Sequence, residues 1–554
     1  MIANPQYMSR SASQTRVYTG WLASVGLFTF FVALFLILRS NQFVAVDGAL
    51  RCLAVYHDPH LFFHGNNHLL YPVNILLWNK LVAALGFVAN TPTEYVHLSQ
   101  ALNSICAAAT LLFVWLLITR ITSDRLLALV LVTMYGFSRA FVLHATNSAE
   151  PVVGLMFSIA ALFVLRQGLR YSRDSRNVSA TLVALAGVLM ALALASYQAM
   201  FLSFLLCLWL CIFDRPEPDA SVLARAKTVF IFGLSCALGI ALIFGWAYST
   251  EGVPIGPRMV RQFTGVAGAE AGHGTFSLSK VVNFPIGLAN NLVQVVPDGY
   301  QGIRGLLKSH QSTWLLAVAA MGCLVLFLLI AFARPAIQAY RTSSPGDRRM
   351  YSLGLVSLIP LLLAIIIWDP LYDKLWLLPF GILIVAFAYS AARAPMSWEM
   401  RNTAIALSLV LIAIEIPTNL RSAIVDSRSE TEGLKDATRV MSVVKPDDAI
   451  VLDFDPLSSL FIAYSGSGNA IMLPTMPRAE AARAINTQLA RCHETHTKFY
   501  FLGILDQPEA VWKPFLEARL GIPYSSFDHY RSQSRTVERF QIRNHAITLR
   551  VYEP

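Results

Sequence analysis

Apolar runs close to the length of a membrane-spanning helix recur along this sequence up to about residue 420. A hydrocarbon core of ~30 Å takes about 20 apolar residues of helix, and α-helices satisfy their own backbone hydrogen bonds in lipid. The chain is 55% hydrophobic and 14% charged, whereas soluble domains carry about 25% charged residues. We therefore expect a polytopic α-helical membrane protein with about 11 transmembrane helices. The predicted spans are 18–39, 96–119, 126–144, 150–170, 179–197, 199–214, 227–248, 313–333, 351–367, 374–392 and 402–418.

The net charge of +10 reflects topology rather than a nucleic-acid partner. Arginines gather in the short loops on one side of the predicted spans, which is the positive-inside pattern. This places the N-terminus in the cytoplasm and the C-terminus outside. The first apolar run is longer than the core of a signal peptide and has no cleavage site after it, so we expect it to be retained. The Arg-rich, Ala-rich composition is typical of a GC-rich bacterium, so the expected location is the bacterial inner membrane, with a periplasmic outer face.

The external side holds most of the non-helical sequence, in the loops 40–95 and 249–312 and in the tail. We expect a transmembrane domain over 1–420 and a periplasmic α/β domain over 421–554. In the tail, strand-like runs at 449–454, 495–505 and 545–554 surround a helical pattern at 478–492, which favours a partly parallel sheet. Asp453 and Asp455 follow the first of these strands, where α/β sheets often bind ligands, although acids there are more often structural. The seven cysteines show no spacing typical of a disulfide framework or a metal cluster.

The first external loop is unusually rich in polar side chains. "VDGALRCLAVYH" (46–57) has helical spacing, with Asp47 at its start, and "HGNNHLLYP" follows, with His64, Asn67, His68 and Tyr71 as candidate substrate contacts. A lone Asp in this setting is more often a helix N-cap. The histidines are placed better for polar contacts with a substrate than for zinc, because Pro59 and Gly65 interrupt any single helix. Residues 70–87 read as a helix lying in the membrane interface.

Two further external segments carry charge. Glu150 begins the fourth span in "HATNSAEPVVGLMF", where capping and catalysis are comparable explanations, although acids at membrane depth are costly unless they are used. "WDPLYDKLWLLPF" (368–380) contributes Asp369, Tyr372 and Lys374. Its aromatic residues fit an interfacial belt, but an external lysine fits a phosphate. Arg258 and Arg261 are candidates for the same phosphate, or for solvent or lipid headgroups.

These segments together resemble the GT-C superfamily of membrane glycosyltransferases, which use a polyprenyl-phosphate-linked sugar as donor. The likeness rests on "VDGAL" and "HGNNHLLYP" after the first span, "NSAEPVVGLMFSIAALFVL", and "WDPLYDKLWLLPF", and it covers about residues 15–420. In plan the chain is similar to protein O-mannosyltransferases and lipid A aminoarabinose transferases. It departs from the former in having one acid in "VDGA" instead of an Asp-Glu pair, so it is assigned to neither branch.

The resemblance implies an inverting transfer to a glycan, lipid or protein acceptor on the periplasmic side. Asp47 would be the general base, and Arg258, Arg261 and Lys374 would stabilise the leaving lipid phosphate. Glu150, His64 and His68 would orient the sugar or acceptor, or hold a divalent cation, since some relatives use a metal and some do not. No cofactor is otherwise implied, and the expected partners are the lipid-linked donor, the acceptor and membrane lipids.

A secondary transporter or a flippase of a lipid-linked sugar is the alternative, because such proteins are also polytopic and carry charges in their spans. Transporters typically show internal repeats and broken helices at the bilayer midplane. This sequence has no repeated halves, and its polar residues gather at one predicted surface. Both observations favour the transferase.

Overall fold

A computed structural model describes thirteen ranges of the chain, and parts of 319–341, 362–369 and 509–517. The ranges are 5–41, 46–57, 68–170, 176–213, 222–251, 277–294, 371–393, 398–428, 432–452, 469–473, 481–506, 522–542 and 545–553. The chain forms two compact units. The first consists of Met1–Arg39, Phe63–Asn74 and Gln100–Val425, and the second of Ser40–Phe62, Ile75–Ser99 and Asp426–Pro554.

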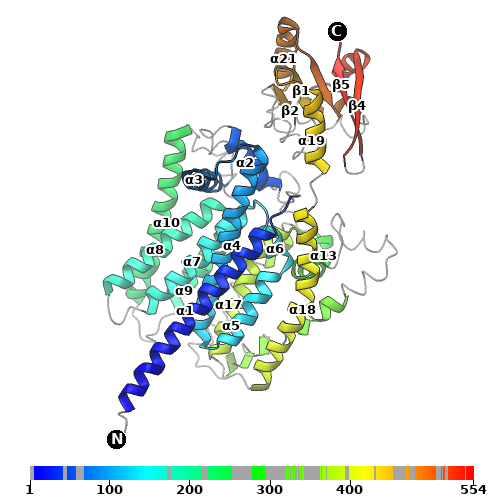
Figure 1. Cartoon of the computed structure of the whole chain (residues 1–554). Helices are drawn as coiled ribbons and strands as arrows, with labels where there is room; N and C mark the ends of the chain where they lie inside the picture. Colours follow the sequence, from blue (N-terminus) through cyan, green and yellow to red (C-terminus); the bar gives the residue numbers. More distant parts are fainter. Residues whose placement is uncertain are drawn as a thin grey trace. The chain divides into compact units, whose positions relative to one another are not determined.

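Helices dominate the first three quarters of the described chain (Figure 1). In order they are α1 (Pro5–Ile37), α2 (Val46–His57), α3 (Leu70–Ala84), α4 (Pro92–Thr122), α5 (Arg125–Phe137), α6 (Arg139–Ala145), α7 (Glu150–Arg170), α8 (Arg176–Ser196), α9 (Phe201–Phe213), α10 (Val222–Glu251), α13 (Leu278–Leu292), α17 (Leu377–Arg393) and α18 (Trp398–Arg428). Short 3₁₀ turns stand before α9 and α17, namely η2 (Gln198–Met200) and η3 (Asp373–Leu375).

These helices confirm a multi-pass α-helical membrane protein. Among the described residues five helices are long and apolar enough to cross a membrane, and six if the bent pair α5–α6 counts as one span. Helices also occupy the predicted spans at 18–39, 199–214 and 374–392. The predicted spans at 313–333 and 351–367 lie largely outside the described residues, so the total of eleven stays a prediction.

One predicted span is broken. The run 126–144 forms α5 and α6, bent by 67°, because Ser138 between them leaves the helical conformation with ψ near 144°. The carbonyl of Phe137 at the break accepts a 2.7 Å hydrogen bond from Asn419 of α18, so this exposed helix end is satisfied by a side chain. The bend directs α6 toward the segment that precedes α17.

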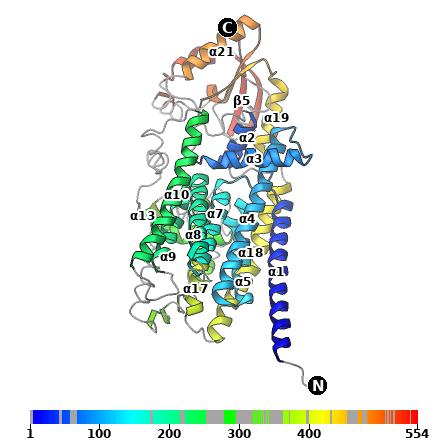
Figure 2. The ribbon, with the colours of Figure 1, turned by 90° about the vertical axis from the view of Figure 1, so that its left-hand side faces the viewer.

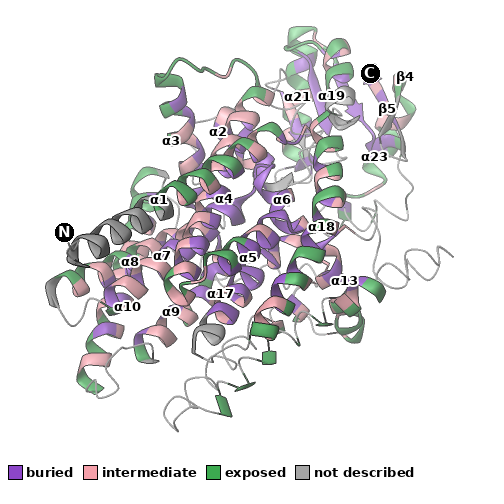
Figure 3. Cartoon of the chain, turned by 60° about the horizontal axis from the view of Figure 1, so that its bottom comes forward, coloured by how far each residue is buried: buried purple, intermediate pink, exposed green. Residues whose placement is uncertain are grey.

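The helices of the first unit differ in how much protein covers them. In their most apolar stretches α7 is 67% buried and α10 only 22%. Figure 3 colours the chain by burial, and buried residues gather around α5 and α17. α8 lies between α7 and α10 and contacts both (Figures 1 and 2). Its close approach to α10 requires Gly187, where an added Cβ would meet the Phe232 carbonyl oxygen at 2.5 Å. The exposed leucines of α10, such as Leu238 and Leu242, suit contact with lipid tails.

The second unit holds a five-stranded sheet. Its strands are β1 (Ala449–Leu452), β2 (Ala470–Met472), β3 (Phe499–Leu502), β4 (Ser534–Ile542) and β5 (His545–Tyr552), in the order β2-β1-β3-β5-β4. β1 runs parallel to β2 and β3, and β5 is antiparallel to β3 and β4. The helices are α19 (Glu432–Val443), α21 (Ala481–Thr495) and α23 (Ser526–Ser532). The predicted α/β tail with a partly parallel sheet is confirmed, and β2 and β4 are additions to it.

The predicted helices of the first external loop are also present, as α2 and α3. In this part of the chain Trp78 donates to the Leu98 carbonyl at 2.7 Å, and Asn79 to Ser99 Oγ at 3.3 Å. Leu77 and Leu81 are more than half exposed. The membrane-surface position of α3 stays a prediction.

Candidate active site

The site lies at the turn between α6 and α7, and side chains of α4 hold this turn through hydrogen bonds. The side-chain amide of Asn103 donates to the carbonyls of Asn147 and Ala149 at 2.9 and 2.8 Å. Ser104 Oγ donates to the Ala145 carbonyl at 3.1 Å. These residues are almost fully buried, and a buried carbonyl left unpaired is costly. α4 therefore fixes the place where α7 begins, at Glu150.

The turn η3 meets this segment through a hydrogen bond and an ion pair. Nε2 of His144 lies 3.1 Å from Oδ1 of Asp373, and Nζ of Lys374 lies 3.6 Å from Oε2 of Glu150. The side chains of His144, Lys374 and Glu150 are 2%, 8% and 1% exposed, while Asp373 is 23% exposed. Residues 144–150 and 373–374 thus form one largely buried cluster of four ionisable groups.

The electrostatics of Asp373 fix its ionisation. Burial alone would raise the pKa of this carboxyl, but the neighbouring His144 side chain outweighs burial and lowers the pKa from 3.8 to about 2. Arg139 and Lys374 act in the same direction. Asp373 is therefore an anion at neutral pH, and the formal charges of Arg139, Lys374, Asp373 and Glu150 cancel.

Four of the candidates predicted from the sequence lie at this cluster or beside it. Glu150 and Lys374 form the ion pair, and the centroid of the Tyr372 ring lies 5.6 Å from Lys374 Nζ. The Tyr71 hydroxyl is 3.5 Å from Asn103 Oδ1, a long contact that ties α3 to the same turn.

His68 is connected to α7 through Tyr197. Its ring is 5.1 Å from that of Tyr197, and Tyr197 packs on Gly154, one turn after Glu150, where an added Cβ would meet the Tyr197 Cβ at 2.9 Å.

The other candidates have different outcomes. Asp369 accepts a 2.9 Å hydrogen bond from the Leu371 amide, which is a turn-capping contact. Asp47 lies in the first turn of α2, and its side chain is not among those described. His64, Asn67, Arg258, Arg261, Asp453 and Asp455 lie outside the described residues.

Sequence reasoning missed four residues of the site: His144, Asp373, Asn103 and Tyr197. Two of them had a local signal, since His144 stands six residues before Glu150 and Asp373 directly precedes Lys374. Asn103 and Tyr197 lie inside or beside apolar helices, and only the tertiary structure brings them to the turn.

The described residues contain no group of three His, Cys, Asp or Glu side chains that could hold a metal ion.

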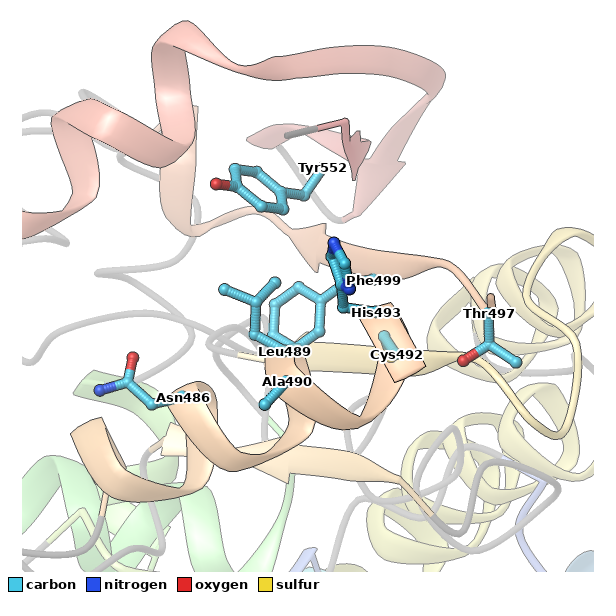
Figure 4. Close-up of a pocket in the computed structure, with 8 residues that line it drawn as sticks. All are labelled: Asn486, Leu489, Ala490, Cys492, His493, Thr497, Phe499 and Tyr552. Carbon is cyan, nitrogen blue, oxygen red and sulfur yellow. The ribbon is translucent and has the colours of Figure 1, made fainter. Parts of the chain in front are cut away.

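The second unit contains a separate hollow of about 340 Å³ between α21 and the sheet (Figure 4). Its floor includes Phe499 and Tyr552, which are paired across β3 and β5. Among the described residues that line it, His493 is the one imidazole, and none is a carboxylate, a lysine or an arginine.

Comparison with known proteins gave structural neighbours only. No protein-family model matches the sequence, and no curated protein matches it. The chain is similar to the structure of ArnT from Cupriavidus metallidurans bound to undecaprenyl phosphate, with a TM-score of 0.46, 10% identity, and coverage of 96% of this chain and 98% of that one. The apo state of the same ArnT gives a TM-score of 0.43 at the same identity and coverage. This is a likeness of overall plan, and no residue's role follows from it.

Proposed function

We propose that this chain is an inverting glycosyltransferase that moves a sugar from a polyprenyl-phosphate carrier to an acceptor at the periplasmic face of the bacterial inner membrane. The observation that carries the proposal is the buried pair of Lys374 and Glu150, next to the pair of His144 and Asp373. Burying four ionisable groups at the start of a membrane helix is costly. A substrate that carries both a phosphate and hydroxyl groups would use all four.

In the proposed reaction an acceptor hydroxyl attacks the anomeric carbon while the bond from that carbon to the phosphate oxygen breaks. The hydroxyl proton goes to Asp47, and the lipid phosphate leaves with the electron pair. Because the leaving group gains negative charge, a cation aimed at it stabilises the transition state. Lys374 has this role, with Arg258 and Arg261 as further cations from the second external loop.

Glu150 keeps Lys374 neutralised in the absence of substrate. A charge buried without a partner is strongly unfavourable, so the carboxylate allows the lysine to remain at the site until a phosphate arrives. When the phosphate binds, Glu150 is available to accept a hydrogen bond from a hydroxyl of the sugar or the acceptor.

The test is a binding and turnover assay of the purified protein in nanodiscs with a panel of undecaprenyl-phosphate sugars. Wild type should bind at least one donor and release undecaprenyl phosphate, if only by slow hydrolysis. Asp47→Asn should bind the donor without consuming it, and Lys374→Gln should bind it more weakly.

The control for the lysine is Lys513→Gln, because Lys513 is half exposed in the second unit and pairs there with Glu509 at 3.0 Å. It should leave binding and turnover intact. Failure of wild type to bind any such lipid would refute the proposal.

A transporter or flippase is the second candidate, and Glu415 is the observation that favours it. This residue lies within α18 and is fully buried. Neither carboxyl oxygen has a hydrogen-bond partner among the described residues. Ionisable groups inside membrane helices often mark transport pathways. Movement of a fluorescent lipid-linked sugar across proteoliposomes, abolished by Glu415→Gln with the donor left intact, would favour transport over transfer.

A further inference from the structure

The imidazole of His144 is held in one tautomer. The Asp373 carboxylate can only accept a hydrogen bond, so the 3.1 Å contact requires the proton on Nε2 of His144. In the neutral ring the other nitrogen, Nδ1, then carries a lone pair and is an acceptor.

That acceptor is buried and unused within the part of the chain that the structure describes. The His144 side chain is 2% exposed, and Nδ1 has no hydrogen-bond partner there. The Oδ1 atom of Asn147, three residues later in the same turn, is in the same condition. The amide of Asn147 is oriented by its Nδ2, which donates to the Leu143 carbonyl at 2.8 Å. Buried polar atoms are nearly always paired, so two acceptors in one turn indicate a ligand that brings donors.

We propose that Nδ1 of His144 and Oδ1 of Asn147 accept hydrogen bonds from hydroxyl groups of the substrate, with Asp373 as the positioning residue that keeps Nδ1 an acceptor. The inference rests on the proposed function and adds to it a subsite for hydroxyls, separate from the phosphate contact at Lys374. A phosphate dianion has no hydrogen to donate, so it does not satisfy these atoms. The hydroxyls belong either to the donor sugar or to the acceptor.

Two substitutions separate the roles of the two ring nitrogens. In His144→Gln the side-chain amide reaches the place of Nε2, so the hydrogen bond to Asp373 is kept while the acceptor at Nδ1 is removed. In Asp373→Asn the amide donates to Nε2, which forces the proton onto Nδ1 and turns the acceptor into a donor. Charge–neutral replacements of this kind in a catalytic Asp–His pair act through the wrong tautomer.

The measurement compares the affinity of each variant for bare undecaprenyl phosphate and for the undecaprenyl-phosphate sugar that wild type binds best. One lost hydrogen bond corresponds to a roughly two- to tenfold loss of affinity. Both variants should lose this factor for the sugar-carrying lipid and keep wild-type affinity for the bare lipid. Lys374→Gln is the matched comparison, because it should weaken both.

Each outcome has one meaning. Unchanged sugar-lipid affinity with slower release of undecaprenyl phosphate assigns the hydroxyls to the acceptor, whose place water takes in hydrolysis. Unchanged affinity and unchanged release overturn the inference, as does an equal loss for both lipids. If wild type binds neither lipid, the proposed function fails and the subsite fails with it.

A spectroscopic measurement tests the tautomer without a ligand. Nitrogen NMR of the ¹⁵N-histidine-labelled protein in nanodiscs, with His144→Gln to assign the signal, should show Nε2 protonated and Nδ1 unprotonated. Asp373→Asn should reverse the pattern. A proton on Nδ1 in wild type at neutral pH contradicts the proposal whatever the binding data show.

Discussion

The pair of Glu150 and Lys374 makes a stability prediction that separates a buried ion pair from a surface one. At 3.6 Å two unit charges attract by about 5 kcal/mol at an effective dielectric constant of about 20, but each also loses its hydration. Removing one partner leaves the other charge buried and alone, which costs about 3–5 kcal/mol. Removing both removes the attraction and the desolvation together. We therefore expect Glu150→Gln and Lys374→Met each to lower the free energy of unfolding strongly, and the double variant to lie close to wild type.

The assay is thermal and denaturant unfolding of the purified protein in one detergent, for wild type, both single variants and the double variant. The control cycle uses Arg535 and Glu553, whose side chains are closer, at 3.1 Å, but 65% and 57% exposed. An exposed pair contributes about 0–1 kcal/mol, so Arg535→Met and Glu553→Gln should change little, alone or together. If the losses at Glu150 and Lys374 simply add in the double variant, the two charges are not coupled and the reasoning is wrong.

Three other substitutions test the packing and the electrostatics. Asn103→Leu leaves two buried carbonyls unpaired and should cost about 2–4 kcal/mol of unfolding free energy. Thr110→Val on the same helix, which removes only an intrahelical bond, should cost less than about 1 kcal/mol. Gly187→Ala should destabilise the α8–α10 contact by about 1–3 kcal/mol, whereas Gly245→Ala, with nothing within 4 Å of the new Cβ, should not. The lowered pKa of Asp373, from 3.8 to about 2, stabilises the fold by about 2 kcal/mol above pH 4, and this contribution is lost as the pH falls through 2. Unfolding midpoints followed below about pH 5 should therefore fall more steeply in wild type than in Asp373→Asn.

The sequence predicts the helices well because an apolar run of this length in lipid satisfies its own backbone hydrogen bonds only as an α-helix. It does not predict how those helices break. The run 126–144 looks like one span by composition, yet Ser138 divides it into α5 and α6. The run 374–392 similarly starts at Leu377, because residues 373–375 form the 3₁₀ turn that carries Asp373 and Lys374. A hydropathy pattern reports composition along the chain, whereas both breaks depend on side chains from other helices.

The sequence predicts some residues of the site but not their arrangement. Glu150 and Lys374 stand out in the sequence because each places a charge at the end of an apolar run. That they meet, 224 positions apart, follows only from the bend at Ser138 and from the Tyr135 hydroxyl, which donates to the Leu377 carbonyl at 2.6 Å. His144 and Asp373 have only their sequence proximity to Glu150 and Lys374 as a signal, and the structure identifies them as partners.

The burial of Glu150 bears on the two explanations that the sequence left open, capping and catalysis. An acid in the first turn of a helix gains about 0.3–1 kcal/mol from the helix dipole even when exposed. Full burial against Lys374 adds desolvation of two charges, which well-packed apolar residues avoid. Capping therefore explains an acid at this position but does not explain one that is 1% exposed and paired with a buried lysine. If the site serves chemistry, the double variant Glu150→Gln/Lys374→Met should unfold like wild type and yet release no undecaprenyl phosphate. A double variant that is both stable and active would show that Glu150 is a helix-capping residue and that the reaction does not need it.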